Sequence, residues 1–341
     1  MYPRVTLRLC RYGAHLTKEQ VADLVAPDPD ALELVNSWLG HHGVSSSMTS
    51  MTHGGSWLTV NGVPVSQAND LLSASYQLYR HSATNVTVLR TISYGLPAEL
   101  HAHVQTISPT TYFGPPAHTL GQTPRMHSGE VAEMRDKDAS GKVVTMLSSR
   151  DNSVTPTFLR KLYEMEGYVP AAPGQNALGI AGFNREYPNP DDLRIFMSRF
   201  HTDGVDATYG VNRVSGGVYD PSNPGLEANH NIQYTAALTY PTSLTFYSTR
   251  GTHNEDDPFL NWINYLLKQP SIPLTVSASY GVDEDAVPPD TALSVCRLFL
   301  QLAGRGVSAL VPSGDDGVGK GDCKDTSGNV RFRPFFPASC T

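Results

Sequence analysis

The sequence lacks several features that would assign it to a common class of protein. It has no run of about 18 apolar residues, the length that a membrane-spanning helix needs. Its first residues, MYPRVTLRLCRYGAHL, contain no apolar core of signal-peptide length. Lys and Arg are not clustered and the net charge is −7, so nucleic acid is not expected as the main partner. We therefore expect neither a membrane span nor an export signal in this chain.

Motifs of common hydrolases and of zinc sites are also missing. No G-x-S-x-G elbow occurs, which excludes the α/β-hydrolases. Two histidine pairs, His41 with His42 and His101 with His103, lack the i, i+4 spacing and the neighbouring Cys or acid cluster that a zinc site needs. These histidines are therefore predicted to lie on the surface, and no metal site is expected in this chain.

Cysteine is scarce, with four residues in 341. Cys323 and Cys340 flank a short Gly-rich segment, as the cysteines of a loop-closing disulfide do. Four cysteines allow three pairings, however, and the sequence does not choose among them. One sequon, Asn85-Val86-Thr87, is a glycosylation acceptor if the chain enters the secretory pathway, and a chance match otherwise.

What the sequence does contain is Gly and Pro, at 29 and 25 residues, and a length that favours two domains. Residues 17–107 alternate short helical and strand patterns, which predicts a small α+β domain. Thr17 and Gln20 form a capping-box pattern at its first helix, and residues 66–81 are predicted to form a later one. Between residues 115 and 151 apolar periodicity is lost and Gly, Ser and charge accumulate. This segment is therefore predicted to be an exposed linker at the domain boundary.

Beyond the linker, short apolar strands alternate with helices. The alternating segments are 177–183, 191–200, 232–240, 243–248, 258–269, 274–281, 291–306 and 307–314. Short apolar strands that are bounded by Gly and Pro and separated by helices imply a parallel sheet covered on both faces. In such sheets the functional loops follow the carboxyl ends of the strands.

The loop after the last of these strands is SGDDGVGKGDC, residues 313–323. Its first part has the spacing of a phosphate-binding loop, G-x-x-x-x-G-K, but Gly321 stands where Ser or Thr should bind magnesium, and the acids would repel phosphate. Oxygen donors for calcium are Asp315, Asp316 and Asp322. Their spacing lacks the alternating acids and the closing Glu of an EF-hand. Nucleotide binding is thus disfavoured, and a weak calcium loop and a solvated turn remain as alternatives.

The stretch GLEANHNIQYTAAL, residues 225–238, places Glu227 and Asn231 four positions apart. If the segment is helical, the two side chains lie on one face about one turn apart, as two carboxylates of a catalytic pair would. Here the second side chain is an amide. The pattern fits a catalytic pair with one member neutralised, and it also fits an ordinary helix with one polar stripe.

Several separated stretches resemble the sedolisins, or serine-carboxyl peptidases, a family that includes the lysosomal and fungal tripeptidyl-peptidases. The amino-terminal part is similar to their pro-domain through RYGAHLTKEQVADLVAPDPDALELVNSWL and GGSWLTVNGVPVSQANDLLSASYQLYRH. The remainder resembles their peptidase domain through SVTPTFLRKLY, NPGLEANHNIQY, PFLNWINYLL, SASYGVDED and VPSGDDGVG…FRPFFPASC. These matches follow the family's order over nearly the whole chain.

The resemblance implies an α/β proenzyme with three parts. Residues 1–114 would form a ferredoxin-like α+β pro-domain that guides folding and plugs the active site. Residues 115–151 would be a linker with a processing site that is cut in acid, and residues 152–341 the first part of a subtilisin-like peptidase domain with a parallel sheet. The resemblance also implies secretion, polypeptide substrates in the full-length family, and a contact between pro-domain and peptidase domain within one chain.

The family's chemistry uses a Ser nucleophile activated by a Glu, an Asp one turn away that holds this Glu, and a second Asp at the oxyanion hole. Position by position, the resemblance implies that Glu227 is the general base, Asn231 occupies the position of the family Asp, and Asp315 is the oxyanion-hole acid. A Glu suffices as a base when an enzyme works in acid, and a protonated Asp can donate a hydrogen bond to a developing oxyanion.

Two departures affect the helix that carries this pair. Asn231 replaces the family acid, and His230 beside it replaces a usual Leu. An amide keeps the shape of a carboxyl group and can donate to Glu227, but it cannot share a proton with it. A loss of activity comparable to that of the Asp-to-Asn change in a histidine triad, about 10⁴ in rate, is therefore expected.

A third departure concerns the end of the chain. The family's nucleophilic Ser and its calcium site lie downstream of FPASC, beyond Thr341, so the Ser is absent here and calcium is expected only in full-length members. The sheet is then expected to be incomplete, with an exposed edge. One hypothesis is that the chain, truncated at both ends, represents part of a fungal-type proenzyme, either a tripeptidyl-peptidase or an endopeptidase. The other is a catalytically dead relative that acts as a binding protein or a pro-domain-type inhibitor.

Overall fold

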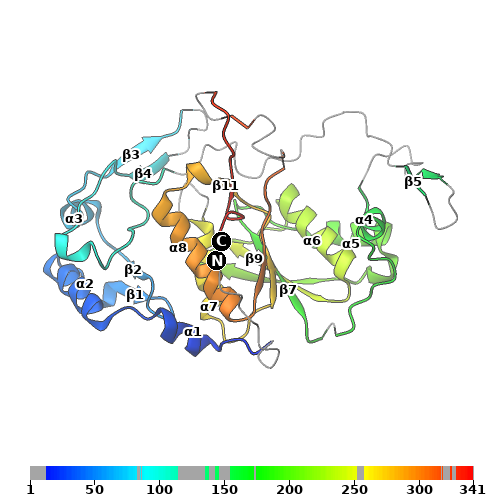
Figure 1. The fold of residues 1–341 in the computed structure, drawn as a ribbon, viewed down its shortest axis with the longest axis horizontal. Coiled ribbons are helices and arrows are strands. Elements are labelled where there is room, and N and C mark those ends of the chain that lie inside the picture. Colours follow the sequence, from blue (N-terminus) through cyan, green and yellow to red (C-terminus); the bar gives the residue numbers. More distant parts are fainter. Residues whose placement is uncertain are drawn as a thin grey trace, which may run out of the picture.

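A computed structural model describes residues 13–82, 85, 87–113, 135–137, 143–145, 154–172, 174–251, 257–315, 317, 323–324 and 328–340. Residues 13–113 form an amino-terminal unit and residues 154–340 a carboxy-terminal unit (Figure 1). Most of the predicted linker, 115–151, lies outside the described residues. Its described parts are two short strands that pair antiparallel, β5 (Arg135–Lys137) and β6 (Val143–Thr145).

The amino-terminal unit combines helices with two antiparallel pairs of strands, β1 with β2 and β3 with β4. Its elements are α1 (Lys18–Val25), α2 (Pro29–His41), η2 (Ser46–Met48), β1 (Thr49–Met51), β2 (Leu58–Val60), α3 (Val65–Leu71), β3 (Gln77–Arg80), β4 (Thr87–Arg90) and η3 (Ala98–Leu100). The predicted capping box is present, because the backbone N of Gln20 donates to Thr17 Oγ1 at 3.2 Å and the backbone N of Thr17 donates to Gln20 Oε1 at 2.9 Å. The small core of this unit contains Leu39, Val44, Leu71 and Leu72.

The helix predicted over residues 66–81 is wrong in its second half. α3 ends at Leu71, and residues 77–80 form strand β3. Between them Ser73 has a φ of 45°, a left-handed conformation that cannot continue a right-handed helix. The chain then pairs with β4, and Tyr79 packs edge-on against Phe113 with ring centroids 4.9 Å apart.

The carboxy-terminal unit is built on a parallel sheet of five strands among the described residues, in the order β12-β10-β7-β9-β8. Its helices are α4 (Pro156–Leu162), α5 (Pro190–Phe200), η4 (Thr202–Gly204), α6 (Leu226–Thr239), α7 (Pro258–Lys268), η5 (Glu284–Ala286) and α8 (Pro289–Gly304). Its strands are β7 (Ala177–Gly182), β8 (Tyr209–Val214), β9 (Ser243–Thr249), β10 (Thr275–Ser277), β11 (Val282–Asp283), β12 (Ser308–Leu310) and β13 (Phe335–Phe336). The predicted α/β fold with a parallel sheet is thus confirmed.

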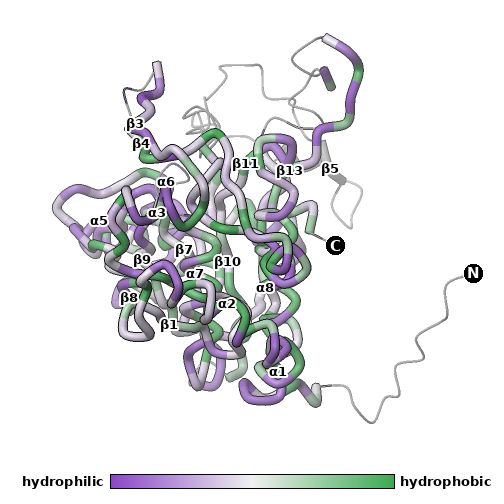
Figure 2. Tube along the Cα trace, turned by 90° about the vertical axis from the view of Figure 1, so that its left-hand side faces the viewer, coloured by the Kyte–Doolittle hydropathy of each residue, from purple (hydrophilic) through white to green (hydrophobic). Residues whose placement is uncertain are grey.

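Helices cover both faces of this sheet, so the carboxy-terminal unit has two cores. Figure 1 shows α7 and α8 on one side of the strands and α5 and α6 on the other. The core on the α7–α8 side is the larger and includes Phe183, Phe259, Trp262, Ile263, Leu266, Val276, Tyr280, Val295 and Leu298. The core on the α5–α6 side includes Ile180, Leu193, Met197, Ile232, Ala236 and Phe246. β7 contributes Ala181 to the larger core and Ile180 to the smaller one, as expected for a strand buried on both faces, and Figure 2 shows its place among the central strands.

The two units contact each other through the carboxyl ends of α7 and α8. The backbone N of Leu16 donates to the Gly304 carbonyl oxygen at 2.9 Å, and Lys18 Nζ donates to the Lys268 carbonyl oxygen at 2.6 Å. A cation at the carboxyl end of a helix complements both its unpaired carbonyl groups and its dipole. Trp57 of the amino-terminal unit packs against the larger core. In the ranges that the structure describes, no helix has the length and apolar character needed to cross a membrane.

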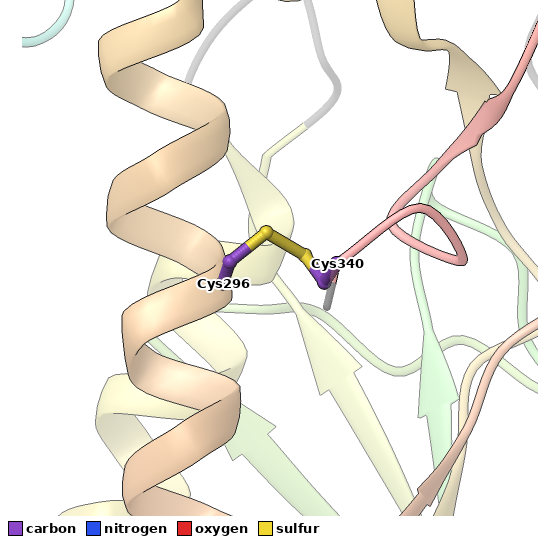
Figure 3. The surroundings of a disulfide bond; sticks show 2 residues. All are labelled: Cys296 and Cys340. Atoms are coloured by element: carbon purple, nitrogen blue, oxygen red, sulfur yellow. A yellow bond between two sulfur atoms is a disulfide. The ribbon is translucent and has the colours of Figure 1, made fainter. Parts of the chain in front are cut away.

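The disulfide predicted between Cys323 and Cys340 is wrong. Cys340 is bonded to Cys296 on α8, with Cα atoms 5.2 Å apart (Figure 3). The physical reason is the antiparallel pairing of β13 with β11, which brings the segment after Phe336 alongside α8. The bond therefore joins the end of the described chain to a helix 44 residues earlier instead of closing the Gly-rich loop.

Candidate active site

α6 carries the two residues of the predicted pair, Glu227 in its first turn and Asn231 one turn later. Both side chains are half-buried. The helix packs on the sheet through Ala228, Ile232, Ala236 and Ala237. The prediction that this stretch is helical is confirmed, so the spacing does place both side chains on one face.

Three loops from the carboxyl ends of parallel strands bring further polar residues to this face. Glu186 follows β7, Ser279 follows β10 and Asp315 follows β12. Ser279 Oγ donates to Asn231 Oδ1 at 2.9 Å. Because the side chains meet here from separate segments of the chain, the arrangement is more than a polar stripe on one helix.

Glu186 contacts the start of α6 directly. Its Oε2 atom accepts hydrogen bonds from the backbone N of Glu227 at 3.0 Å and from that of Ala228 at 3.3 Å. The residue at the N-cap position of α6, Gly225, has no side chain that could do this. A carboxylate from another loop therefore caps the helix that carries Glu227.

The environment of Glu227 raises the pKa of its carboxyl group. Burial is the main cause, and the negative charges of Glu186 and Asp315 add to it. The Asn231 amide acts in the opposite direction and lowers this pKa. Nδ2 of Asn231 is nevertheless buried and makes no hydrogen bond of good geometry to any residue that the structure describes. A carboxyl group at this position would leave no such donor.

His230 lies beside the pair on α6. Its ring packs against Tyr234 with centroids 4.7 Å apart. Burial lowers the pKa of His230, and the nearby charge of Asp315 raises it. Asp315 therefore influences both Glu227 and His230, which places the predicted oxyanion-hole residue close to the predicted base.

Sequence reasoning missed Glu186 and Ser279. One feature of the sequence could have indicated Glu186 as a site residue: it lies just after an apolar strand, where functional loops of parallel sheets are found. Ser279 lies in SASYGVDED, a stretch that supports the resemblance but offers no local pattern for a contact with Asn231.

Metal binding finds no support within the described residues, where no three side chains of His, Cys, Asp or Glu gather in a way that could hold an ion. The calcium loop weighed for the Gly-rich segment depends on Asp316 and Asp322, which lie outside the described residues. The expectation that calcium occurs only in full-length members therefore stays a prediction.

The chain is similar in sequence to a family of known peptidases. Residues 8–113 match the family model of the pro-kumamolisin activation domain. Over 97% of its length the chain is 32% identical to tripeptidyl-peptidase SED2 of Arthroderma otae, and over 96% it is 30% identical to tripeptidyl-peptidase SED3 of the same fungus. By these comparisons the chain is similar to the sedolisin family along almost its whole length. Sedolisins are serine-type peptidases, and the match to an activation domain places a pro-domain at the amino terminus.

The sedolisin relatives are longer than the region they share with this chain. The chain spans 57% of the length of the SED2 peptidase and 56% of that of the SED3 peptidase. Among solved structures, Pseudomonas sedolisin, a serine-carboxyl proteinase complexed with two molecules of pseudo-iodotyrostatin, is similar at a TM-score of 0.39 and 19% identity. That match covers 55% of this chain and 51% of the other.

Proposed function

We propose that this chain is part of a secreted acid peptidase proenzyme of the sedolisin family that releases tripeptides from polypeptides or cleaves within them. Glu227 is the general base, Asn231 occupies the position of its acidic partner, and Asp315 is the oxyanion-hole residue. The observation that carries the proposal is the convergence of these residues on one face of α6, in a chain similar to tripeptidyl-peptidases along almost its whole length. The nucleophilic Ser would come from the part of the protein that corresponds to the relatives' remaining length.

The electrostatics of Glu227 support the role of base. A carboxylate with an ordinary pKa is a weak base toward a Ser hydroxyl, and a raised pKa makes it a stronger one. Burial beside two negative charges has this effect on Glu227. The cost is that Glu227 is protonated over a wider range of acidic pH, so the base function is lost at the lowest pH values.

The proposed proenzyme has three parts. Residues 1–114 would be the pro-domain, 115–151 the linker that is cut, and 152–341 the peptidase part. The hydrogen bonds of Leu16 and Lys18 to the ends of α8 and α7 support a pro-domain that is held on the peptidase part within one chain. Secretion would allow glycosylation at Asn85, which lies exposed between β3 and β4.

The experiment compares Asn231→Asp with the wild type in the protein expressed from its complete transcript. After acid treatment, release of tripeptides is measured on a peptide with a free amino terminus. Asn231→Asp is expected to raise kcat/KM by up to about 10⁴, because a carboxyl group can share a proton with Glu227. The double variant Glu227→Gln/Asn231→Asp is the control and should be inactive. Equal activity of the double variant and Asn231→Asp would show that Glu227 is not the base.

A second function is favoured by Asn231 itself. The family acid is replaced by an amide, whose buried Nδ2 makes no hydrogen bond of good geometry to a described residue. On this alternative the protein would be a catalytically dead relative that binds and inhibits active ones through its pro-domain. Residues 1–114 alone would then inhibit an active sedolisin. A lack of inhibition by a fragment that circular dichroism shows to be folded would eliminate this alternative.

A further inference from the structure

The loop that carries Glu186 is attached to the first turn of α6 at three places. The backbone N of Gly225 donates to the Tyr187 carbonyl oxygen at 3.0 Å, and the backbone N of Asn189 donates to Asn229 Oδ1 at 2.8 Å. Between these two contacts lie the hydrogen bonds from Glu227 and Ala228 to Glu186. The loop and the helix start therefore form one connected element.

The backbone before Glu186 is unusual. Asn184 and Arg185 both have positive φ values, 57° and 60°. A left-handed conformation is uncommon for residues other than glycine and costs free energy, so it persists only where the surroundings enforce it. Here it directs the chain so that the Glu186 side chain lies across the helix start.

Gly225 provides the space for this carboxylate. A Cβ atom at position 225 would lie 2.5 Å from Cβ, Cγ and Oε2 of Glu186, closer than real Cβ atoms approach their neighbours. An ordinary capping residue, such as Ser or Asp, is therefore excluded at this N-cap. The capping function is performed instead by Glu186, which lies 41 positions before Glu227 in the chain.

The electrostatic consequence reaches Glu227. The amino end of a helix carries positive partial charge, which normally favours an ionised acid in the first turn. Glu186 satisfies two of those N–H groups and adds a negative charge of its own. The other groups that face Glu227 are Asp315 after β12, Tyr280 after β10 and Asn231 on α6 itself. Of these, Asp315 adds repulsion, and the Asn231 amide favours the ionised form.

We propose that Glu186 is a positioning residue for Glu227: its carboxylate accepts from the first N–H groups of α6, fixes the first turn of this helix and places a negative charge beside Glu227. The proposal rests on the proposed function insofar as Glu227 is the base. In the peptidase, Glu186 would thereby help to set the pH below which Glu227 is protonated and cannot act as a base.

The test is the titration of Glu227, followed through its side-chain carboxyl ¹³C shift and assigned with Glu227→Gln. Glu186→Gln keeps an oxygen that can accept the two N–H groups but removes the charge. It should lower the pKa of Glu227 while the melting temperature stays near that of the wild type. Glu166→Gln, a substitution of an exposed glutamate, is the matched control and should leave the titration of Glu227 unchanged. An unchanged pKa of Glu227 in folded Glu186→Gln would overturn the proposal.

A second measurement needs no variant. The first N–H groups of a helix have no partner within the helix, so they exchange slowly with solvent only where another group accepts from them. The backbone amides of Glu227 and Ala228, which donate to Glu186, should therefore be protected from exchange. Exchange of both at the rate of an unprotected amide would overturn the proposal even if Glu186→Gln does not fold.

An assay of peptide hydrolysis distinguishes the positioning role of Glu186 from the proposed peptidase function. In the Asn231→Asp background, Glu186→Gln should move the acidic limb of the rate profile to lower pH. If neither form hydrolyses peptides but the titration of Glu227 still shifts, the proposed function fails and the positioning role of Glu186 stands. If peptides are hydrolysed with the same acidic limb in both forms, the positioning role fails alone.

Discussion

Glu227 lies in a position that disfavours its ionised form, because burial and two neighbouring negative charges raise its pKa. Such a group stabilises the folded state fully below the pKa that it has in the unfolded chain. This contribution is lost as pH rises through the higher pKa of the folded state. At neutral pH, ionised Glu227 therefore lowers the free energy of unfolding.

Glu227→Gln should remove this pH dependence. The variant is expected to melt at a higher temperature than the wild type at pH 7, and at the same temperature near pH 3, below the ordinary pKa of glutamate at about 4.3. Thermal denaturation at several pH values measures the difference. A constant difference across that range would show that the fold does not perturb Glu227.

For single residues, the sequence predicts contacts within one helix and misses contacts between residues that are far apart in the chain. Glu227 and Asn231 share one short helical segment, so their spacing alone places them on one face. Glu186 is 41 residues from Glu227, and its link to α6 runs through backbone N–H groups, which leave no trace in the residue pattern. The partner of Cys340 could not be predicted for the same reason, since it is set by how β13 and α8 pack.

Among the elements, α6 is anchored at both ends by charged side chains from elsewhere. Glu186 caps its amino end, and Arg160 on α4 donates to the carbonyl oxygens of Ala237 and Leu238, each at 3.0 Å. Negative charge at the amino end and positive charge at the carboxyl end both complement the helix dipole. The helix that carries Glu227 is thus fixed by two other segments of the chain.

Arg160→Met should loosen the carboxyl end of α6. Hydrogen bonds from a charged donor contribute about 1.5–3 kcal/mol, so a loss of free energy of unfolding of about that size is expected in urea denaturation. Hydrogen exchange of the last turn of α6 should rise as well. Lys161→Met, a change at the exposed neighbour on the same helix, should alter neither quantity. Equal effects of the two substitutions would contradict the anchoring role of Arg160.

The Cys296–Cys340 disulfide closes a loop of 44 residues between α8 and the segment after β13. For a loop of this length, loss of the bond is expected to lower the free energy of unfolding by about 4 kcal/mol, because the unfolded chain gains freedom. Denaturation of the double variant Cys296→Ala/Cys340→Ala measures this loss. Cys323→Ala should keep the bond, which peptide mapping without reduction can establish. A bond between Cys323 and Cys340 in that mapping would contradict the structure.

The strands also differ in how well their sequences predict them. The apolar strand β7, ALGIAG, could be predicted from its composition, because it is buried on both faces. β8 was missed. It has the sequence YGVNRV and lies at the edge of the sheet, where of its residues only Val214 is fully buried. An edge strand contacts the core on fewer sides, so its sequence carries a weaker signal.

For the whole molecule, the contacts between the two units include hydrogen bonds at the carboxyl ends of α7 and α8 and the packing of Trp57 on the larger core, on the side of the sheet opposite α6. The family resemblance predicted both a pro-domain and a parallel α/β sheet, and both are confirmed. The way in which the amino-terminal unit docks could not be predicted, because it depends on single contacts such as Lys18 with the end of α7.

The central claim is that Glu227 acts as the base of an acid-activated sedolisin. The most direct measurement is mass spectrometry of the protein from its complete transcript during incubation at acidic pH, with cleavage between residues 115 and 151 as the readout. The account predicts fast cleavage in Asn231→Asp, slow cleavage in the wild type and none in Glu227→Gln. Cleavage of Glu227→Gln at the same sites and rate as the wild type would contradict it.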